Sequence, residues 1–419
     1  MLMNAQERGT ITHKGVVEIH KNNRRLPPSM HIQQGKRIID YRKLYTLLEK
    51  IKANEKIPAK KEFFGNTPNV FVGKFGYPNI NVGFLSVNEQ SEQHDNPRVW
   101  AEQHYDIPKI VSLRSSLVNS NYNVFVKATS RFMDMSKEVS LAAKPVEMEI
   151  HLEKTPKVSF SFEQDITPYG PSVKLESAKI TANPKIPQQV EKIVTDDLLA
   201  NEAMNLLYQK GFDEHYLTKI FSMGNLGKES SQKIVPTRWS ITATDDMIGK
   251  KIIDDIKDFP QSNYYAYFGG YLGNYYVIML FPDAWSYELF EISVSSKKVW
   301  TDHEDVFGRK TYAEHTVGGY YAARLAILEQ LKKVKKQATV LTLRFVTDDY
   351  YLPLGVWVVR QATRAAMQSQ AIEFASKELM LQYAKMIAKK KFGLDIEFII
   401  KQSKILSVIQ TQKKLSAYN

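Results

Sequence analysis

Apolar and polar residues alternate with a period of two along part of the chain. Two series show this, Val146, Met148, Ile150, Leu152 and Val158, Phe160, Phe162. Alternation of this kind places every second side chain of a strand on a buried face. Gly and Pro cluster at 73–78 and 168–171, where turns are expected. The pattern therefore predicts a β-rich region over residues 68–184, with 73–78 as a tight turn between strands.

In the second half of the chain, patterns typical of helices and strands follow one another. Apolar residues recur at helical spacing over 187–221 and Thr316–Lys336, and Ala362–Lys391 is expected to form another long helix that ends before Gly393. An N-terminal helix is expected at 38–51. The expected strands are 264–268 and 275–281, joined as a hairpin, then 286–294 and 340–346. The sequence thus predicts an α+β fold with mixed sheets flanked by helices.

A chain of 419 residues is long for one core, so we expect several parts. Residues 1–62 form a basic N-terminal segment, 63–185 a β-rich subdomain and 186–410 an α/β subdomain. Residues 411–419 have no apolar periodicity and are expected to form a mobile tail.

Charge and cysteine content narrow the function. The net charge is +12, and residues 14–61 hold 13 Lys and Arg against four acidic residues. Such an excess favours an anionic partner, of which nucleic acid is the commonest. The chain has no Cys, which excludes disulfides, thiolate metal sites and Cys nucleophiles. No apolar run is long enough to span a bilayer, so we expect a cytoplasmic protein without a membrane partner.

Several segments, in order along the chain, resemble the archaeal Nre family. They are Val70–Pro78, Ala143–Val146, Val235–Ala243, Gly308–Tyr312, Gly318–Arg324 and Pro353–Trp357. The resemblance implies a DNA-damage repair factor that works with the sliding clamp PCNA.

The chain departs from the family at one point. Members of the family often have a four-Cys zinc finger near the N-terminus, whereas the corresponding stretch here, His31–Leu44, offers only His31 as a metal ligand. One ligand does not hold a tetrahedral zinc ion. We therefore expect no structural zinc, and the segment would have to be held by packing.

The last eight residues are similar to a PCNA-interacting peptide. Residues three apart lie on one face of a 3₁₀ turn, so Leu415 and Tyr418 would form an apolar plug with Gln412 at its base. Asn419 stands where such peptides usually have a second aromatic residue, which should weaken docking. The alternative is an ordinary frayed chain end.

The basic N-terminal segment is the first candidate for DNA contacts. Arg24, Arg25, Arg37 and Arg42 lie near Tyr41 and Tyr45 in the sequence. Basic and aromatic side chains together favour binding to the phosphate backbone with optional base stacking, largely independent of sequence. The alternative is a solvated helix face.

A third group mixes Arg, Asp and Gly. Its members are Arg238, Asp245, Asp246, Asp302, Glu304, Arg309, Gly318, Gly319 and Arg324. A Gly pair at a helix N-terminus lets backbone amides approach an anion, arginines clamp phosphate, and carboxylates hold a divalent cation. One hypothesis is that these residues converge on a phosphate site. The alternative is a structural network of ion pairs between helix and sheet.

The favoured function is a DNA repair factor that binds DNA non-specifically through basic surfaces and docks on PCNA. Its expected partners are PCNA, DNA and other repair proteins. One alternative is a metal-dependent nuclease or an enzyme that handles a nucleotide or phosphate, for which the cofactor would be a divalent cation. Another is a scaffold that bridges PCNA to other repair proteins without DNA affinity.

Overall fold

The computed structural model describes residues 60–157, 159–163 and 166–411, together with positions 10–11, 16–18, 33–34, 37–38, 43, 46–47 and 49. The chain divides into two compact units. Unit 1 comprises Met1–Met247 with Tyr351–Val356, and unit 2 comprises Ile248–Tyr350 with Trp357–Asn419. The division falls inside helix α8 (Thr237–Ile256), while the β-rich subdomain expected at 63–185 lies within unit 1.

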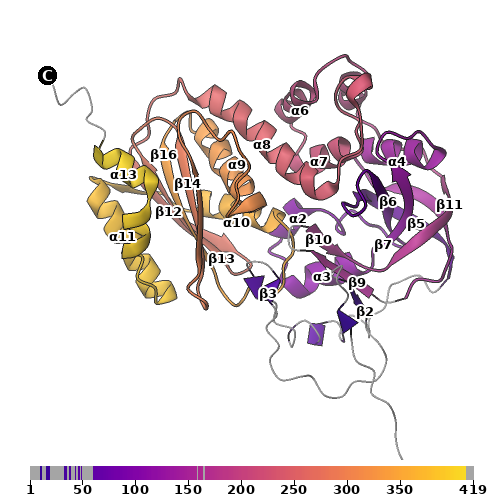
Figure 1. The fold of residues 1–419 in the computed structure, drawn as a ribbon, viewed down its shortest axis with the longest axis horizontal. Coiled ribbons are helices and arrows are strands. Elements are labelled where there is room, and N and C mark those ends of the chain that lie inside the picture. The colour runs from indigo at the N-terminus through magenta and orange to yellow at the C-terminus, as the bar shows by residue number, and fades with distance from the viewer. Residues whose placement is uncertain are drawn as a thin grey trace, which may run out of the picture. The chain divides into compact units, whose positions relative to one another are not determined.

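A closed five-stranded barrel forms the centre of unit 1, in the order β11-β7-β6-β5-β8 (Figure 1). All neighbouring strands run antiparallel except β7 and β11, which run parallel. Numbered along the chain, the barrel strands have the order 1-2-3-5-4, which is the topology of the OB-fold, a Greek-key barrel. The strands are β5 (Glu62–Val72), β6 (Asn79–Val87), β7 (Val118–Phe125), β8 (Val146–Leu152) and β11 (Ser172–Ile180).

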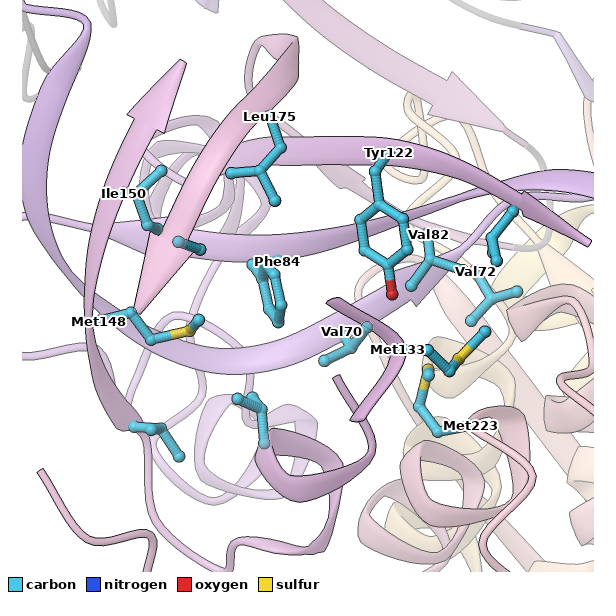
Figure 2. Packing of buried hydrophobic residues seen from close by; sticks show 14 of the residues in the cluster. Val70, Val72, Val82, Phe84, Tyr122, Met133, Met148, Ile150, Leu175 and Met223 are labelled. Carbon is cyan, nitrogen blue, oxygen red and sulfur yellow. The ribbon is translucent and has the colours of Figure 1, made fainter. Parts of the chain in front are cut away.

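Alternation along these strands fills the barrel with apolar side chains. In β8 the residues at even positions are buried and those between them face outward or are half-buried, as the sequence pattern predicted. Figure 2 shows Phe84 of β6 at the centre of this core, with Ile150 of β8 to one side and Val82 of β6 beside Tyr122 to the other. Helix α4 (Arg131–Leu141) adds Met133 to the same core, and the Ser130 side chain caps it by accepting from the Met133 amide.

The other described elements of unit 1 surround the barrel. A four-stranded sheet has the order β1-β2-β9-β10, and β3 pairs with β4. Its strands are β1 (Thr10–Ile11), β2 (Val16–Glu18), β9 (Ser159–Glu163) and β10 (Ile166–Tyr169), and the pair is β3 (Gln33–Gln34) and β4 (Arg37–Ile38). The helices are α2 (Pro97–Glu102), α3 (Ile107–Ser115), α5 (Gln188–Val194), α6 (Ala200–Gln209), α7 (Glu214–Ser222) and the 3₁₀ turn η1 (Glu229–Ser231).

Unit 2 is a six-stranded mixed sheet with helices on both faces (Figure 1). The sheet order is β15-β14-β16-β13-β12-β17, and only β14 and β16 pair in parallel. The strands are β12 (Tyr264–Tyr271), β13 (Asn274–Phe281), β14 (Ser286–Ser293), β15 (Val299–Glu304), β16 (Thr339–Val346) and β17 (Ile372–Phe374). One face carries α9 (Val317–Lys333) and α10 (Trp357–Met367), and the other carries α11 (Lys377–Phe392), α12 (Glu397–Gln402) and α13 (Lys404–Thr411).

The predicted α+β class, with mixed sheets flanked by helices, is confirmed. The long helix expected over 362–391 is wrong, because β17 interrupts it by pairing with β12 at the sheet edge. A new helix then starts where the Ser376 side chain accepts from the Leu379 amide. Its end was predicted correctly, since Gly393 adopts a left-handed conformation with φ of 68°. No helix among the described residues is long and apolar enough to cross a membrane.

Candidate functional site

A layer of charged side chains lies between helix α9 and the sheet of unit 2. Strand alternation turns Phe290 toward the apolar core under α11, and it turns its neighbour Glu291 toward α9. Glu291 pairs there with the buried Arg344 of β16. A Cβ at Gly319 would lie 2.7 Å from Oε1 of Glu291. Glycine at this position of α9 is therefore required by close approach to a buried ion pair.

Asp302 supplies the negative charge at the N-terminus of α9. Its Oδ2 accepts from the backbone amides of His315 at 2.9 Å and Thr316 at 2.6 Å, and from the Thr316 hydroxyl at 2.7 Å. A carboxylate here is favoured by the positive end of the helix dipole. The sequence predicted that an anion binds near Gly318 and Gly319. In the structure, the Asp302 carboxylate is the anion at this helix end, and it accepts from the amides of the residues that precede the helix. Asp302 lies on β15, which brings its side chain to this helix end.

The arginines of this layer are engaged within the protein. Arg324 donates to Glu304 at 2.8 Å, and both side chains are fully buried. The indole of Trp285 donates to the other oxygen of Glu304 at 3.0 Å. Arg309 lies 3.5 Å from Oδ1 of Asp302 and donates to the carbonyl of His303 at 2.8 Å.

Tyr320 lies beside both of these arginines. The guanidinium carbons of Arg309 and Arg324 lie 5.4 Å and 6.0 Å from its ring centre. Burial raises the pKa values of Tyr320 and of its neighbour Tyr287 well above the ordinary range, so both stay neutral. Within the described part of the chain, neither hydroxyl has a hydrogen-bond partner. The layer therefore combines satisfied charges with polar groups that are costly to bury.

The structure brings together six of the nine candidates, namely Asp302, Glu304, Arg309, Gly318, Gly319 and Arg324. The other three, Arg238, Asp245 and Asp246, lie on the part of α8 that belongs to unit 1, where the sequence analysis placed no helix. Among the residues that the structure describes, no group of three or more His, Asp or Glu is arranged to hold a metal ion. The contacts favour the network of structural ion pairs, and we propose no catalysis at this cluster.

A second buried cluster, which the sequence analysis missed, centres on Asp95 in unit 1. Arg114 of α3 donates to its Oδ1 at 2.5 Å, His215 of α7 lies 3.1 Å from its Oδ2, and Asn69 of β5 donates to Oδ2 as well. Burial alone would raise the pKa of Asp95, but the charges of Arg114 and His215 and two hydrogen bonds outweigh it and hold the pKa well below its usual range. The partners lie up to 146 residues apart, so no local pattern marks them.

His215 is the accessible member of this cluster, with a third of its side chain exposed. Burial disfavours its charged form, but Asp95 and Asp213 outweigh burial and raise its pKa. One turn along α7, burial lowers the pKa of Lys219 to about 8. A carboxylate that orients an imidazole is typical of general bases. Among the described hydrogen bonds, however, His215 makes none to a hydroxyl. We therefore interpret the cluster as a clasp between α3, α7 and β5.

The other predicted contacts fall outside the described residues. This holds for Gln412, Leu415, Tyr418 and Asn419 of the tail, and for Arg24, Arg25 and Arg42 near the N-terminus. Arg37 lies on β4, but its side chain is not among those described.

Comparison with known proteins gives matches along most of the chain. The family model "Archaeal Nre, N-terminal" matches residues 41–301, and "Archaeal Nre, C-terminal" matches residues 304–418. DNA repair protein NreA of Archaeoglobus fulgidus is 36% identical, over 79% of this chain and 85% of its own length. NreA of Haloferax volcanii is 33% identical over 75% and 80%, and NreB of Archaeoglobus fulgidus is 32% identical over 88% and 95%. No solved structure matches.

We predict that breaking the buried pair under α9 destabilises the protein strongly. Arg324→Met leaves the Glu304 carboxylate buried without its cation, which should cost about 3–5 kcal/mol in the free energy of unfolding. Lys228→Met is the control, because it removes the exposed Lys228–Asp197 pair and should cost less than about 1 kcal/mol. Urea denaturation measures both. The double variant Arg324→Met/Glu304→Leu should recover most of the loss, and equal stability of Arg324→Met and the unmodified chain would contradict the described burial.

We also predict that the His215–Asp95 pair makes stability depend on pH. Because the pKa of folded His215 is raised above 6.5, its stabilising charge is fully present below pH 6.5 and is lost as pH rises through the folded pKa. The stability difference between the unmodified chain and His215→Gln should therefore be largest below pH 6.5 and shrink above it. Denaturation series at several pH values measure this, with Lys228→Met as the control. A difference that stays constant with pH would rule out the charged pair.

Proposed function

The chain belongs to the archaeal Nre family, and on that premise we propose that it is a DNA repair factor that binds DNA through basic surfaces and docks on the sliding clamp PCNA. A role in DNA repair follows from its relatives, three of which are DNA repair proteins. The observation that carries the proposal is the match to both family models, which together run from residue 41 to residue 418. The proposed partners are PCNA, DNA and other repair proteins. The proposed location of the protein is the cytoplasm.

The last described helix supports docking through the tail. Glu288 of β14 accepts from the Ser403 hydroxyl and from the amides of Lys404 and Ile405, which fixes the start of α13 on the sheet. Ile405 and Leu406 are buried in the core below it. The helix ends at Thr411, directly before the peptide motif. The motif therefore directly follows an element that is packed on the sheet of unit 2.

Charge supports the DNA contacts. The net charge of +12 includes the excess of basic residues in 14–61, which carries Arg24, Arg25, Arg37 and Arg42. Cationic segments of this kind neutralise backbone phosphates and release counterions, so they bind without reading sequence.

We expect the tail to be necessary for clamp binding. Deletion of 412–419, or Leu415→Ala with Tyr418→Ala, should abolish co-elution with PCNA in gel filtration, because each apolar side chain contributes about 1.5–3 kcal/mol when fully buried. Lys413→Ala with Ser416→Ala is the matched control and should retain binding, since these positions would lie off the face that Leu415 and Tyr418 share in a 3₁₀ turn. All variants should keep the unfolding midpoint of the unmodified chain. Co-elution of the truncated chain with PCNA would refute the assignment.

We expect DNA binding to weaken steeply with salt. Replacing Arg24, Arg25, Arg37 and Arg42 by Gln should lower the slope of log K against log salt for duplex DNA by about 0.9 for each phosphate that is no longer neutralised. Fluorescence anisotropy over a salt series gives the slope. Lys192→Gln with Lys210→Gln, two changes outside the basic segment, is the control and should leave the slope unchanged. An unchanged slope in the arginine variant would show that duplex DNA binds at a different surface.

A further inference from the structure

Exposed aromatic rings gather at one end of the barrel of unit 1. Among the residues that the structure describes in this unit, five aromatic side chains are exposed, and four of them belong to segments that meet at this end of the barrel. These four, which we call the aromatic tip, are Phe75, Tyr77, Phe125 and Trp239, with exposed fractions of 54%, 42%, 46% and 46%. The fifth, Phe64, is paired with Glu149 far along β5 from this end. Water-exposed rings cost free energy when they have no partner, and a cluster of them marks a binding surface.

Three segments that are distant in sequence build the tip. The β5–β6 turn carries Phe75 and Tyr77, and its Pro78 carbonyl accepts from the Val126 amide at 3.0 Å. The Val126 carbonyl in turn accepts from the Ile234 amide at 3.1 Å. The N-terminus of α8 is attached to β5, because the Val72 amide donates to the Thr237 hydroxyl at 3.0 Å. The rings of Tyr77 and Trp239 pack with their centres 5.3 Å apart. The three segments are thus held together by two backbone hydrogen bonds, a hydrogen bond to the Thr237 hydroxyl and a ring contact.

The three segments that build the tip carry charge of one sign. The segments 73–79, 123–131 and 233–239 contain no Asp or Glu, but they contain five cations, Lys74, Lys127, Arg131, Lys233 and Arg238. Lys127, Arg131 and Lys233 are exposed. The ammonium group of Lys74 lies 5.0 Å from the ring centre of Phe75. An aromatic surface whose own segments carry only cations suits a polyanion that has flat groups of its own.

The outer face of β6 and β7 continues from the tip and is neutral. It presents Asn79, Asn81, Asn121 and Asn123, and Asn79 is the sheet partner of Phe125. The Asn123 amide donates to Asn81 at 3.2 Å. Amide side chains offer both donors and acceptors, so they can meet base edges and phosphates without repulsion. Every large hydrophobic residue exposed in the three segments is aromatic, which favours stacking on bases over an aliphatic protein interface.

We propose that the aromatic tip and the adjoining β6–β7 face bind single-stranded DNA, with bases stacked on the rings and phosphates near the lysines. The inference rests on the proposed function, since DNA repair exposes single strands, and it names a second DNA site besides the basic N-terminal segment. The topology agrees by analogy. OB-folds bind oligonucleotides on strands 2 and 3 and the loop between strands 1 and 2, which correspond here to β6, β7 and residues 73–78.

The test compares ring variants of the full chain on four probes. The variant Phe75→Ala/Phe125→Ala removes two rings, Phe75→Tyr/Phe125→Tyr keeps two rings, and Phe64→Ala removes an even more exposed ring outside the tip. The probes are an oligothymidylate of about twenty nucleotides, which exceeds the roughly 4–16 nucleotides that one OB-fold covers, an abasic oligomer, an oligouridylate and a duplex, all of equal length. Anisotropy gives the affinities. Unfolding curves and clamp binding verify that every variant is folded.

Stacking predicts a specific pattern of losses. Removing both rings should weaken oligothymidylate binding on the order of 100-fold, about tenfold per ring, while binding to the abasic oligomer and the duplex stays unchanged. The Tyr variant and Phe64→Ala should bind like the unmodified chain. Equal oligothymidylate affinity after loss of both rings would overturn the inference and leave the proposed function intact. Tighter binding to oligouridylate would overturn the DNA assignment. An unmodified chain that binds none of the probes would overturn the proposed DNA binding as well.

Discussion

A charge buried in a protein must be paired, and this constraint organises unit 2. Glu304 and Arg324 are both fully buried, so β15 and α9 are held at the distance that one ion pair allows. Glu291 and Arg344 impose the same condition on β14 and β16 a short distance away. Helix α9 fits against these charges only because Gly319 carries no side chain. The polar layer therefore determines how α9 lies on the sheet. The opposite face of the sheet packs against α11, α12 and α13 through an apolar core.

The segments that resemble the family are of two kinds. Some are explained by the pairing of buried charges, and others are not. Gly318–Arg324 has a structural explanation, because Gly319 makes room for one buried ion pair and Arg324 belongs to another. Val70–Pro78 and Val235–Ala243 also contain buried residues, yet they meet at a surface where Tyr77 and Trp239 stay exposed. Folding alone gives no reason to keep large rings in water. This contrast points away from the charged cluster and toward the barrel as the place where the protein meets its ligand.

Sequence patterns predicted the elements whose cause is local. The alternation in β8 and the helical spacing of α9 both depend on neighbours within a few residues, and both elements were found, although α9 is buried all round from Gly318 to Leu328 and not along one stripe. The break between α10 and α11 was missed because it depends on pairing of β17 with β12, about 100 residues away. The glycine pair of α9 was predicted to approach an anion and Asp302 to hold a cation, but a strand brings the Asp302 carboxylate itself to the helix end. The Asp95 clasp and the aromatic tip were missed for the same reason, since their members meet only in the folded chain.

A strand-binding surface and a clamp-binding tail on one chain would reinforce each other. Phosphate contacts and base stacking are sequence-tolerant and weaken with salt, so a site built from them is not expected to select a place on DNA. A clamp that encircles DNA holds its ligand near the strand, and a tethered site experiences an effective concentration in the millimolar range when the linker can span the distance. Even modest affinity at the aromatic tip would then suffice for occupancy. In this arrangement the clamp determines where the protein acts, and the tip selects unpaired DNA once it is there.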